Sequence, residues 1–292
     1  MASQKSKLNK ESFSSYCADG ANYKSEFIDV SENVSIRLIT FSPARPSNKP
    51  PIVFVPGWVS QINGWLQVLL EMTREYTVYY IETREKISSI VQVEGDAEYS
   101  IEVMGKDVIE VLKHIQIIDK KYYLFGSSLG GTIILDLWRF LQNKPLSLIL
   151  VGPNAEFRVP KSWHYIVKFF YPPLYNLLKP SVKWYLRTFR MNIESDFAQY
   201  EKYSVALDSA DPWKLKKALL SVEKYKVWDL LADIHTPTLI FSASKDKLHE
   251  PENLQRMAHT LPNATIIDME TNSGTHSSEM VYQLNTYLAK LK

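Results

Sequence analysis

The sequence predicts an α/β fold in which a mainly parallel sheet carries helices on both faces. Three features of the chain support this prediction. Short apolar runs alternate with amphipathic segments, a glycine-rich turn joins two apolar runs in mid-chain, and a glycine-free aromatic interval interrupts the alternation. With 292 residues, 45% of them hydrophobic, the chain is long for one simple domain and short for two. We therefore expect one large core with an inserted element.

Eight short apolar runs predict the strands. The first two flank the turn-prone tripeptide SEN, which predicts a hairpin. Pro56 and Gly57 end the third run, PPIVFV, and most of the later runs are separated by segments long enough for a helix, as parallel strands require. The expected strands lie at residues 25–30, 35–41, 50–55, 77–82, 120–125, 146–152, 236–244 and 264–270.

Apolar residues that recur every three or four positions predict the helices. Ile101, Met104, Val108 and Val111 share one face of an expected helix at 101–115. The run that follows the glycine-rich turn is apolar nearly all round, which is typical of a helix buried against a sheet. The expected helices lie at residues 64–75, 101–115, 132–142, 251–261 and 280–291.

Between Gly152 and Thr236 the alternation of strands and helices stops. Residues 154–235 hold 16 aromatic residues, no glycine and several apolar runs with helical spacing. This interval predicts a helical cap that lies over the carboxyl edge of the sheet. We therefore expect a polar leader at 1–22, a core formed by 23–153 and 236–292, and a cap at 154–235.

The composition excludes several classes of function. Basic residues outnumber acidic ones by only two, so the chain lacks the strong positive field of a nucleic-acid-binding protein. The single cysteine, Cys17, excludes a disulfide framework and a cysteine-based metal site, and we expect a free thiol in a reducing compartment. No signal peptide and no window of about 18 apolar residues is present. We expect a cytoplasmic protein.

The segment LFGSSLGG, residues 124–131, is a candidate nucleophile turn. The pattern GxSxG fits Gly126, Ser128 and Gly130, whereas a pattern centred on Ser127 would need a glycine where Phe125 stands. A serine on a sharp turn between a strand and a helix projects its oxygen from the sheet edge, and the crowded turn needs small flanking residues. We expect Ser128 to be the nucleophile and Ser127 to be a small turn residue.

A serine hydroxyl needs a base to take its proton, and the base needs a carboxylate to orient it. On this type of sheet the chain order is serine, acid, histidine. Three late histidines satisfy that order. His276 lies in a loop after the last strand and is the expected base, whereas His259 lies inside a predicted helix and His249 follows the expected acid too closely. The earlier histidines fail the order: His114, His164 and His235.

Asp246 is the expected acid because it follows the strand at 236–244, at the sheet edge where functional groups collect. The alternative interpretation makes it a turn residue that caps the helix begun near Pro251. Asp268 and Glu250 are the rival acids. A tetrahedral intermediate also needs two amide donors. We expect one from Leu129 and the second from Trp58 or Val59.

The segments VFVPGW, LFGSSLGG, LIFSASKD and SGTH occur in the order found in the α/β-hydrolase superfamily. The chain resembles its capped members over about residues 25–291. The resemblance implies an eight-stranded sheet with a lid inserted after the sixth strand. It also implies Ser128 as nucleophile, Asp246 as orienting acid, His276 as base, and Trp58 and Leu129 as the oxyanion hole.

The chain departs from this family pattern in two places. Pro56 stands where family members commonly have histidine before the glycine of the oxyanion loop, and IETREKISS replaces the usual aspartate and glycine-rich loop after the fourth strand. The dehalogenase and epoxide-hydrolase relatives carry aspartate at the nucleophile position. Ser128 therefore argues against both of those reactions.

Residues 157–190 of the expected cap hold seven basic residues, no acidic residue and many aromatic ones. Three interpretations compete. The apolar faces close over the site while the lysines face water, the segment docks on an anionic membrane surface, or its charges guide an anionic substrate headgroup. Four aromatic residues are candidates for substrate binding: Trp163, Phe170, Tyr185 and Phe189.

Together these features predict a serine hydrolase that cleaves a carboxylic ester or thioester with a hydrophobic acyl or alcohol part. No metal or organic cofactor is expected, and the partner is a small hydrophobic molecule. An acyltransferase, a lactonase or a C–C hydrolase would use the same residues. The alternative from another class is a ligand-binding receptor or scaffold of the same fold with little turnover.

Overall fold

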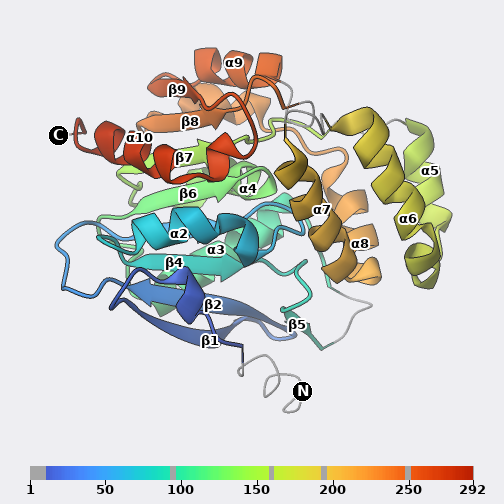
Figure 1. The fold of residues 1–292 in the computed structure, drawn as a ribbon, viewed down its shortest axis with the longest axis horizontal. Coiled ribbons are helices and arrows are strands. Elements are labelled where there is room, and N and C mark those ends of the chain that lie inside the picture. The colour runs from blue at the N-terminus through green and yellow to red at the C-terminus, as the bar shows by residue number, and fades with distance from the viewer. Residues whose placement is uncertain (1–10, 93–96, 158–160, 192–195, 247–250, 292) are drawn as a thin grey trace.

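The computed structural model describes residues 11–92, 97–157, 161–191, 196–246 and 251–291. Within these residues one sheet of nine strands forms the centre of the molecule, in the order β1-β2-β4-β3-β6-β7-β8-β9, with β5 paired to β2 (Figure 1). The strands are β1 (Asn22–Ser31), β2 (Val34–Ser42), β3 (Ile52–Val55), β4 (Val78–Glu82), β5 (Ile90–Val91), β6 (Tyr123–Ser127), β7 (Ser147–Val151), β8 (Thr238–Ser242) and β9 (Ala264–Asp268).

The sheet is antiparallel at one edge and parallel elsewhere. β1 pairs with β2, and β2 with β4 and β5, in antiparallel fashion, whereas every neighbouring pair from β4 through β3 to β9 is parallel. The mainly parallel α/β sheet expected from the sequence is therefore confirmed. The two-residue strand β5 was not predicted, because its pairing depends on β2 rather than on a recognisable apolar run.

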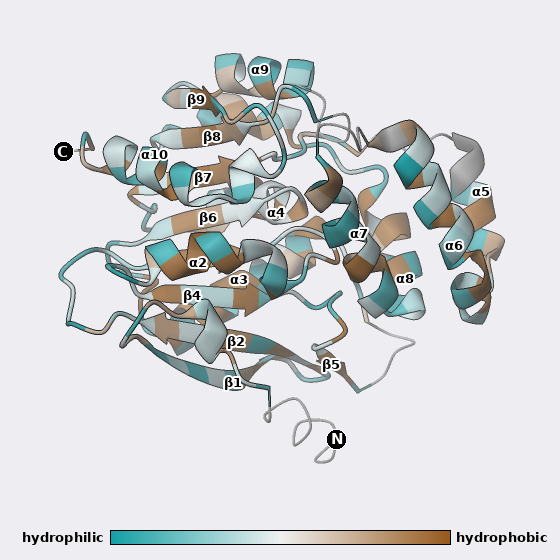
Figure 2. Cartoon of the chain, viewed as in Figure 1, coloured by the Kyte–Doolittle hydropathy of each residue, from teal (hydrophilic) through white to brown (hydrophobic). Residues whose placement is uncertain are grey.

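Helices cover both faces of the sheet and define two apolar layers. One layer contains buried residues of α3 (Ile101–His114), α4 (Leu129–Leu137) and α9 (Pro251–Thr260). The other contains those of α2 (Leu66–Met72) and α10 (Ser278–Leu288), together with Phe13 and Cys17 from the expected leader. Figure 2 shows the hydrophilic and hydrophobic residues alternating along α2.

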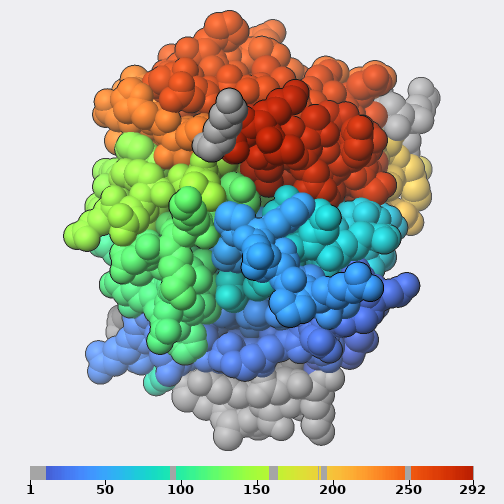
Figure 3. Space-filling view, turned by 90° about the vertical axis from the view of Figure 1, so that its left-hand side faces the viewer, coloured from blue at the N-terminus to red at the C-terminus, as the bar shows by residue number. Residues whose placement is uncertain are grey.

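The C-terminal helix α10 packs beside α2 on one face of the sheet. Figure 3 shows the C-terminal helix, in red, beside residues of the N-terminal third, in blue. Tyr76, just after α2, donates a hydrogen bond of 2.8 Å from its hydroxyl to the side-chain oxygen of Asn285 in α10. The short helical turns of the core are η1 (Ser14–Tyr16), η2 (Ile62–Trp65), η3 (Trp138–Phe140), η6 (Trp228–Asp233) and η7 (Gly274–His276).

A helical segment lies between β7 and β8 and stands to one side of the sheet (Figure 1). It contains α5 (Lys161–Phe169), η4 (Pro172–Leu174), α6 (Tyr175–Tyr185), the π-helical turn η5 (Leu186–Arg190), α7 (Phe197–Ser209) and α8 (Pro212–Val222). We call α5 to α8 the inserted helices. The exact borders of leader, core and cap stay a prediction.

Candidate active site

Ser128 occupies a strained turn between β6 and α4. Its φ of 47° and ψ of −115° lie outside the favoured regions for a residue with a side chain. Two glycines make the turn feasible. A Cβ atom on Gly126 would come within 2.6 Å of Ile134, and one on Gly130 would come within 2.0 Å of the Val55 carbonyl oxygen. The helix α4 therefore begins at Leu129, three residues earlier than its apolar periodicity indicated.

Residues far apart in the sequence line one cavity with Ser128. The cavity has a volume of about 440 Å³, and Trp58, Asp246 and His276 are among the side chains that line it. Asp246 is buried four residues after the end of β8, and His276 ends the short turn η7 after β9. The structure thus brings the sequence-predicted serine, acid and histidine to a common space at the sheet edge.

Asn272 connects Asp246 to His276. Its side-chain nitrogen donates to a carboxylate oxygen of Asp246 over 3.1 Å, and its backbone carbonyl lies 2.9 Å from Nδ1 of His276. Because a carbonyl oxygen only accepts, this contact places the proton of the neutral imidazole on Nδ1. Nε2 then holds the lone pair, as a general base requires.

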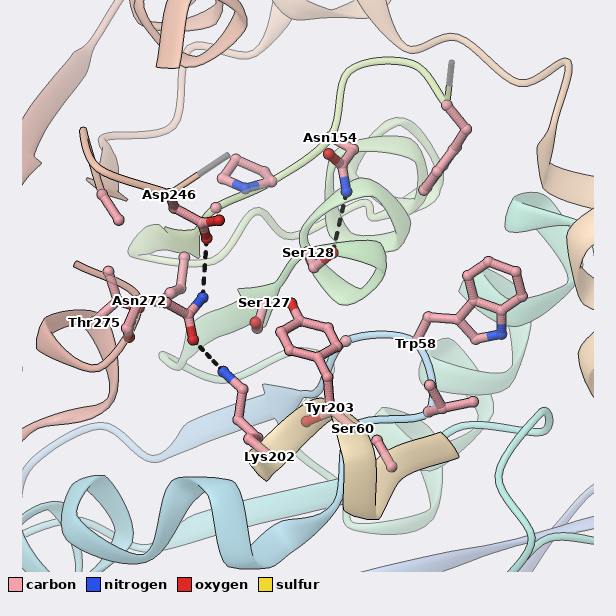
Figure 4. Close-up of a pocket in the computed structure, with 18 of the residues that line it drawn as sticks. Trp58, Ser60, Ser127, Ser128, Asn154, Lys202, Tyr203, Asp246, Asn272 and Thr275 are labelled. Atoms are coloured by element: carbon pink, nitrogen blue, oxygen red, sulfur yellow. Dashed lines mark hydrogen bonds between the residues drawn. The ribbon is translucent and has the colours of Figure 1, made fainter. Parts of the chain in front are cut away.

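Ser128 is held by the loop after β7. The side-chain nitrogen of Asn154 donates a hydrogen bond of 3.1 Å to the Ser128 hydroxyl (Figure 4). The carbonyl of Asn154 in turn accepts from the hydroxyl of Thr132, in the first turns of α4. Asn154 therefore fixes the serine from outside its own turn. The sequence offered no signal for it beyond its position after a predicted strand.

The loop that replaces the family pattern after β4 supports the turn at Gly57. The buried ammonium group of Lys86 donates a hydrogen bond to the Gly57 carbonyl and lies 3.1 Å from a carboxylate oxygen of Glu85. The amide of Ser60 also donates to the Gly57 carbonyl, over 3.1 Å. Val59 within this turn has a φ of 46°, which is unusual for a β-branched residue. Pro56 has no side-chain donor that could hold this turn. The hydrogen bond from Lys86 to the Gly57 carbonyl holds it instead.

Backbone amides at the cavity are available as donors. Within the described residues, the amide nitrogens of Trp58 and Leu129 make no hydrogen bond to another residue. Leu129 opens α4, so its amide belongs to the first turn of a helix, where amides lack intrahelical acceptors. Trp58 lies across the cavity from Asp246 in Figure 4.

Helix α7 contributes polar side chains that the sequence analysis missed. Gln199 donates to a carboxylate oxygen of Asp246 over 3.0 Å. Lys202 donates to the side-chain oxygen of Asn272, and its Nζ lies 3.2 Å from Nε2 of His276. Tyr203 points into the same cavity from the same helix (Figure 4). These residues gave no pattern along the chain, because only the docking of α7 brings them to the site.

Burial shifts the ionisation of the α7 side chains. Desolvation lowers the pKa of Lys202 to about 8, although the negative charges of Asp246 and Asp196 act in the opposite direction. Desolvation, with a smaller contribution from Asp246, raises the pKa of the Tyr203 hydroxyl well above its usual range. At neutral pH the cavity therefore contains a lysine that is still charged and a tyrosine that keeps its proton.

Helix α8 binds the 86–89 loop, whose Lys86 contacts the turn at Gly57. The buried Lys214 ammonium donates to the carbonyl oxygens of Lys86 and Ser89 over 2.9 and 2.8 Å, and to the Ser89 hydroxyl over 2.7 Å. A chain of contacts thus runs from α8 through Lys86 to the turn at Gly57. The sequence predicted an insertion in this place but none of these contacts.

The other candidate residues lie elsewhere. His259 bonds to the carbonyl of Gln255 within α9, and Asp268 accepts from the amides of Ser244 and Glu270. His249 and Glu250 fall outside the described residues. Four histidines are not among the described residues that line the cavity: His114, His164, His235 and His259.

Three of the aromatic candidates for substrate binding, Phe170, Tyr185 and Phe189, are not among the described residues that line this cavity. Tyr185 and Phe189 are exposed and pack against each other, with ring centroids 5.6 Å apart, and Phe170 is half-buried at the end of α5. The side chain of Trp163 falls outside the description. The substrate-binding role of these four residues stays a prediction. The inserted helices line the cavity with other side chains: Leu186, Lys202, Tyr203, Ala206, Leu207, Leu215 and Leu219.

Two further searches covered the described residues only. No group of three or more histidine, cysteine, aspartate or glutamate side chains there is arranged to hold a metal ion. In the same part of the chain, none of the helices combines the length and the apolar character needed to cross a bilayer.

Comparisons with known proteins agree with this geometry. "Putative carbamate hydrolase RutD" of Pseudomonas syringae pv. syringae (strain B728a) is 24% identical over 256 residues, which cover 82% of this chain and 92% of the relative. "Putative esterase/lipase" of Haemophilus influenzae is 21% identical over 225 residues, or 75% of this chain and 74% of the relative. The crystal structure of a hydrolase from Pseudomonas aeruginosa PA01 superposes with a TM-score of 0.74 at 17% identity, covering 92% of this chain and 98% of that one.

The sequence profile described as "Serine aminopeptidase, S33" matches residues 97–273, which is more than half of the chain. The matched span runs from just before α3 to the residue before η7, so it includes Ser128, Asp246 and the inserted helices. The protein therefore belongs to the serine aminopeptidase, S33 family and is a hydrolase of the α/β-hydrolase superfamily.

Proposed function

We propose that the protein is a serine hydrolase that cleaves a carboxylic ester or thioester with a hydrophobic acyl or alcohol part through an acyl-enzyme. The strained backbone of Ser128, facing a cavity that Asp246 and His276 also line, is the observation that carries the proposal. The names of the two relatives, a carbamate hydrolase and an esterase/lipase, support hydrolysis of a carbonyl compound.

In the proposed reaction, Nε2 of His276 takes the proton of the Ser128 hydroxyl while the oxygen attacks the substrate carbonyl carbon. The hydrogen bond from Nδ1 to the Asn272 carbonyl favours the tautomer with a free lone pair on Nε2. Asp246, bound to the Asn272 side chain, stabilises the imidazolium that forms. His276 then gives the proton to the leaving oxygen or sulfur.

The negative oxygen of the tetrahedral intermediate is bound by the amides of Leu129 and Trp58 in this proposal. Each such donor is worth about 10²- to 10³-fold in kcat in a water-excluded site. Lys86 keeps the turn at Gly57 in place and so positions the Trp58 amide. Water activated by His276 then releases the acid from Ser128, which restores the enzyme.

The walls of the cavity support a hydrophobic substrate portion. Several apolar side chains of the core and the inserted helices line it: Val151, Leu186, Leu207, Leu215, Leu219 and Phe241. Burying a chain or ring against such walls contributes about 25 cal/mol for each Å² of apolar surface removed from water. This energy favours substrates with an acyl or alcohol part of several carbons.

A fluorophosphonate probe tests the proposal, because it phosphonylates an activated serine. We expect labelling of the wild-type protein and of Ser127→Ala, and none of Ser128→Ala, with a parallel loss of ester hydrolysis of roughly 10³-fold or more. Ser127 is the matched control, since it lines the same cavity one residue away. A folded wild-type protein that remains unlabelled would favour the receptor or scaffold alternative. An ester and thioester panel of graded acyl length, with lactones and acyl acceptors added, separates the same-triad alternatives.

We also propose that α5 and α6 dock peripherally on an anionic membrane, while the bulk of the protein stays in the cytoplasm. Figure 2 colours parts of both helices brown, and large apolar side chains there face solvent: Tyr165, Ile166, Phe169, Leu177, Leu178 and Trp184. Lys168 and Arg187 lie exposed among them. Such a surface suits the boundary between headgroups and acyl chains. Flotation with anionic and with neutral liposomes tests this, and failure to float with anionic liposomes contradicts it.

A further inference from the structure

The inserted helices place a positive charge inside the cavity. Lys202 is the one lysine or arginine among the described residues that line the cavity with Ser128. It also borders a second, more open cavity, which shares Lys202, Asn272 and His276 with the first. Figure 4 shows its side chain reaching from α7 toward Asn272, below Asp246.

The direct partners of this ammonium are neutral. Nζ donates to the Asn272 side-chain oxygen and lies 3.2 Å from Nε2 of His276. None of the ion pairs found among the described residues includes Lys202, and the charges of Asp246 and Asp196 act on it through space. A half-buried cation without an ion pair is costly, as the lowered pKa of Lys202 indicates. Such a charge is expected where a ligand completes the pair.

The contact with His276 has a chemical consequence. Since Nδ1 carries the imidazole proton, Nε2 is the acceptor of the Lys202 hydrogen bond. The same lone pair has to take the proton of Ser128 in the proposed reaction. Lys202 therefore competes with Ser128 for the base in the described state, and its ammonium has to move before Nε2 can accept that proton.

The position of the ammonium indicates which part of the substrate it meets. A leaving atom that receives a proton from Nε2 comes within about 3 Å of that nitrogen. The Lys202 Nζ is 3.2 Å from the same nitrogen. The leaving atom and the Lys202 Nζ are thus at most about 6 Å apart. One hydrogen bond and two or three covalent bonds span this distance. An anion on the leaving group falls within this span.

We propose that Lys202 binds a carboxylate carried by the leaving alcohol or thiol of the substrate, and that this ion pair draws the ammonium away from His276. The inference rests on the proposed serine-hydrolase function and names its substrate class: short-chain acyl esters or thioesters of hydroxy or mercapto acids. The carboxylate keeps its charge throughout. The bond from the carbonyl carbon to the leaving atom breaks, the leaving atom takes the proton from His276, and water completes the hydrolysis.

The test compares two esters that differ in one charge, butyryloxyacetate and butyryloxyacetamide. We expect the wild type to favour the carboxylate by roughly 10- to 100-fold in kcat/KM, the range for one charge-assisted hydrogen bond. Lys202→Met is expected to lose this preference and to hydrolyse the amide faster than the wild type does, because His276 is freed. Lys202→Arg is expected to keep the preference. Lys113→Met, an exposed lysine of α3, is the control that changes neither rate.

The pH dependence gives a second readout. We expect the preference to decline as the pH rises past about 8, where Lys202 loses its charge, and no such decline in Lys202→Met. The charged and titratable groups that contact Lys202 or act on its charge are Asp246, Asp196, His276 and Tyr203, and Glu156 also lines the cavity. Loss of the Lys202 charge is the change expected to lower the ratio of the two rates as the pH rises.

The outcomes separate the inference from the proposed function. Fluorophosphonate labelling of Ser128 without any preference for the carboxylate overturns the inference alone. Absent labelling overturns both. Monomethyl succinate and methyl succinamate differ by a carboxylate on the acyl side. A preference for the carboxylate in this pair alone also overturns the inference, because Lys202 would then bind the acyl part and not the leaving group. A Lys202→Met protein that slows both esters equally assigns Lys202 a structural role.

Discussion

The two halves of the inserted helices differ in what they contact. α7 and α8 place Gln199, Lys202 and Lys214 against the loops of the core, where these side chains bond to Asp246, Asn272 and the 86–89 loop. α5 and α6 expose large apolar side chains such as Phe169, at 78%, and Leu177, at 75%. One insertion thus contains a half that completes the site and a half that faces outward. Substitutions in the two halves are expected to affect different properties.

Replacing Lys214 tests the half formed by α7 and α8, and it has the largest expected effect on stability and activity. Lys214→Met removes a donor from the Ser89 carbonyl, the Lys86 carbonyl and the Ser89 hydroxyl. The Lys86 carbonyl keeps the Ser89 amide as a donor, whereas a buried group left without a partner costs about 1–3 kcal/mol. We expect the free energy of unfolding in urea to fall by about 2–4 kcal/mol and kcat to fall roughly 10²-fold as the turn at Gly57 loosens.

The matched control is Lys183→Met on α6, whose ammonium pairs with Asp208 at the surface. Its expected effect on the free energy of unfolding is below about 0.5 kcal/mol. Equal effects of the two substitutions would remove the contrast between the halves.

The charge of Lys202 gives a stability effect that depends on pH. Its pKa in the folded protein is about 8, below the ordinary 10.5, so the unfolded chain binds more protons between these two values. Stability of the wild type is therefore expected to rise between pH 8 and 10.5. Relative to Lys202→Met, it should be lower by about 1–2 kcal/mol at pH 7, after allowance for partial exposure. Urea unfolding at pH 7 and 10 measures this, and a difference independent of pH contradicts it.

Removing Gln199 weakens the environment of Asp246. Gln199→Leu takes a side-chain amide donor from the buried carboxylate, which costs about 1 kcal/mol. We expect kcat for a neutral ester to fall roughly 5- to 10-fold with little change in KM. Glu201→Gln, exposed on the same helix, is the control and should leave both constants unaltered. A change in KM alone would place Gln199 in substrate binding instead.

Substitutions in α5 and α6 have the smallest expected effect on the hydrolysis of a soluble ester. The double substitution Phe169→Ser and Leu177→Ser is expected to change kcat/KM for a soluble ester less than twofold and the free energy of unfolding by less than about 0.5 kcal/mol. The same protein should float less with anionic liposomes. A loss of soluble activity would show that α5 and α6 take part in catalysis after all.

Much of the fold could be predicted because its signals are local. Each of the parallel strands is an apolar run next to a turn residue, and α3 follows its apolar periodicity closely. The strand β5 and the early start of α4 escaped prediction because pairing with β2 and the strained turn at Ser128 depend on distant neighbours. The site followed the same division. Ser128, Asp246 and His276, which line the cavity, lie in turns or loops that follow strands and could be proposed from the sequence, whereas Asn154, Asn272 and Lys86 could not.

By itself, the sequence determined the alternation of strands and helices, the serine turn and the order of the three candidate catalytic residues. Local steric rules and hydrophobic periodicity act over a few residues and leave a readable pattern. Only the tertiary structure decided which side chains surround that serine. Lys202 is more than seventy residues from both Ser128 and His276, and its place beside the imidazole follows from the docking of α7 on the core. Long-range packing sets such contacts, and it has no counterpart in any short stretch of the chain.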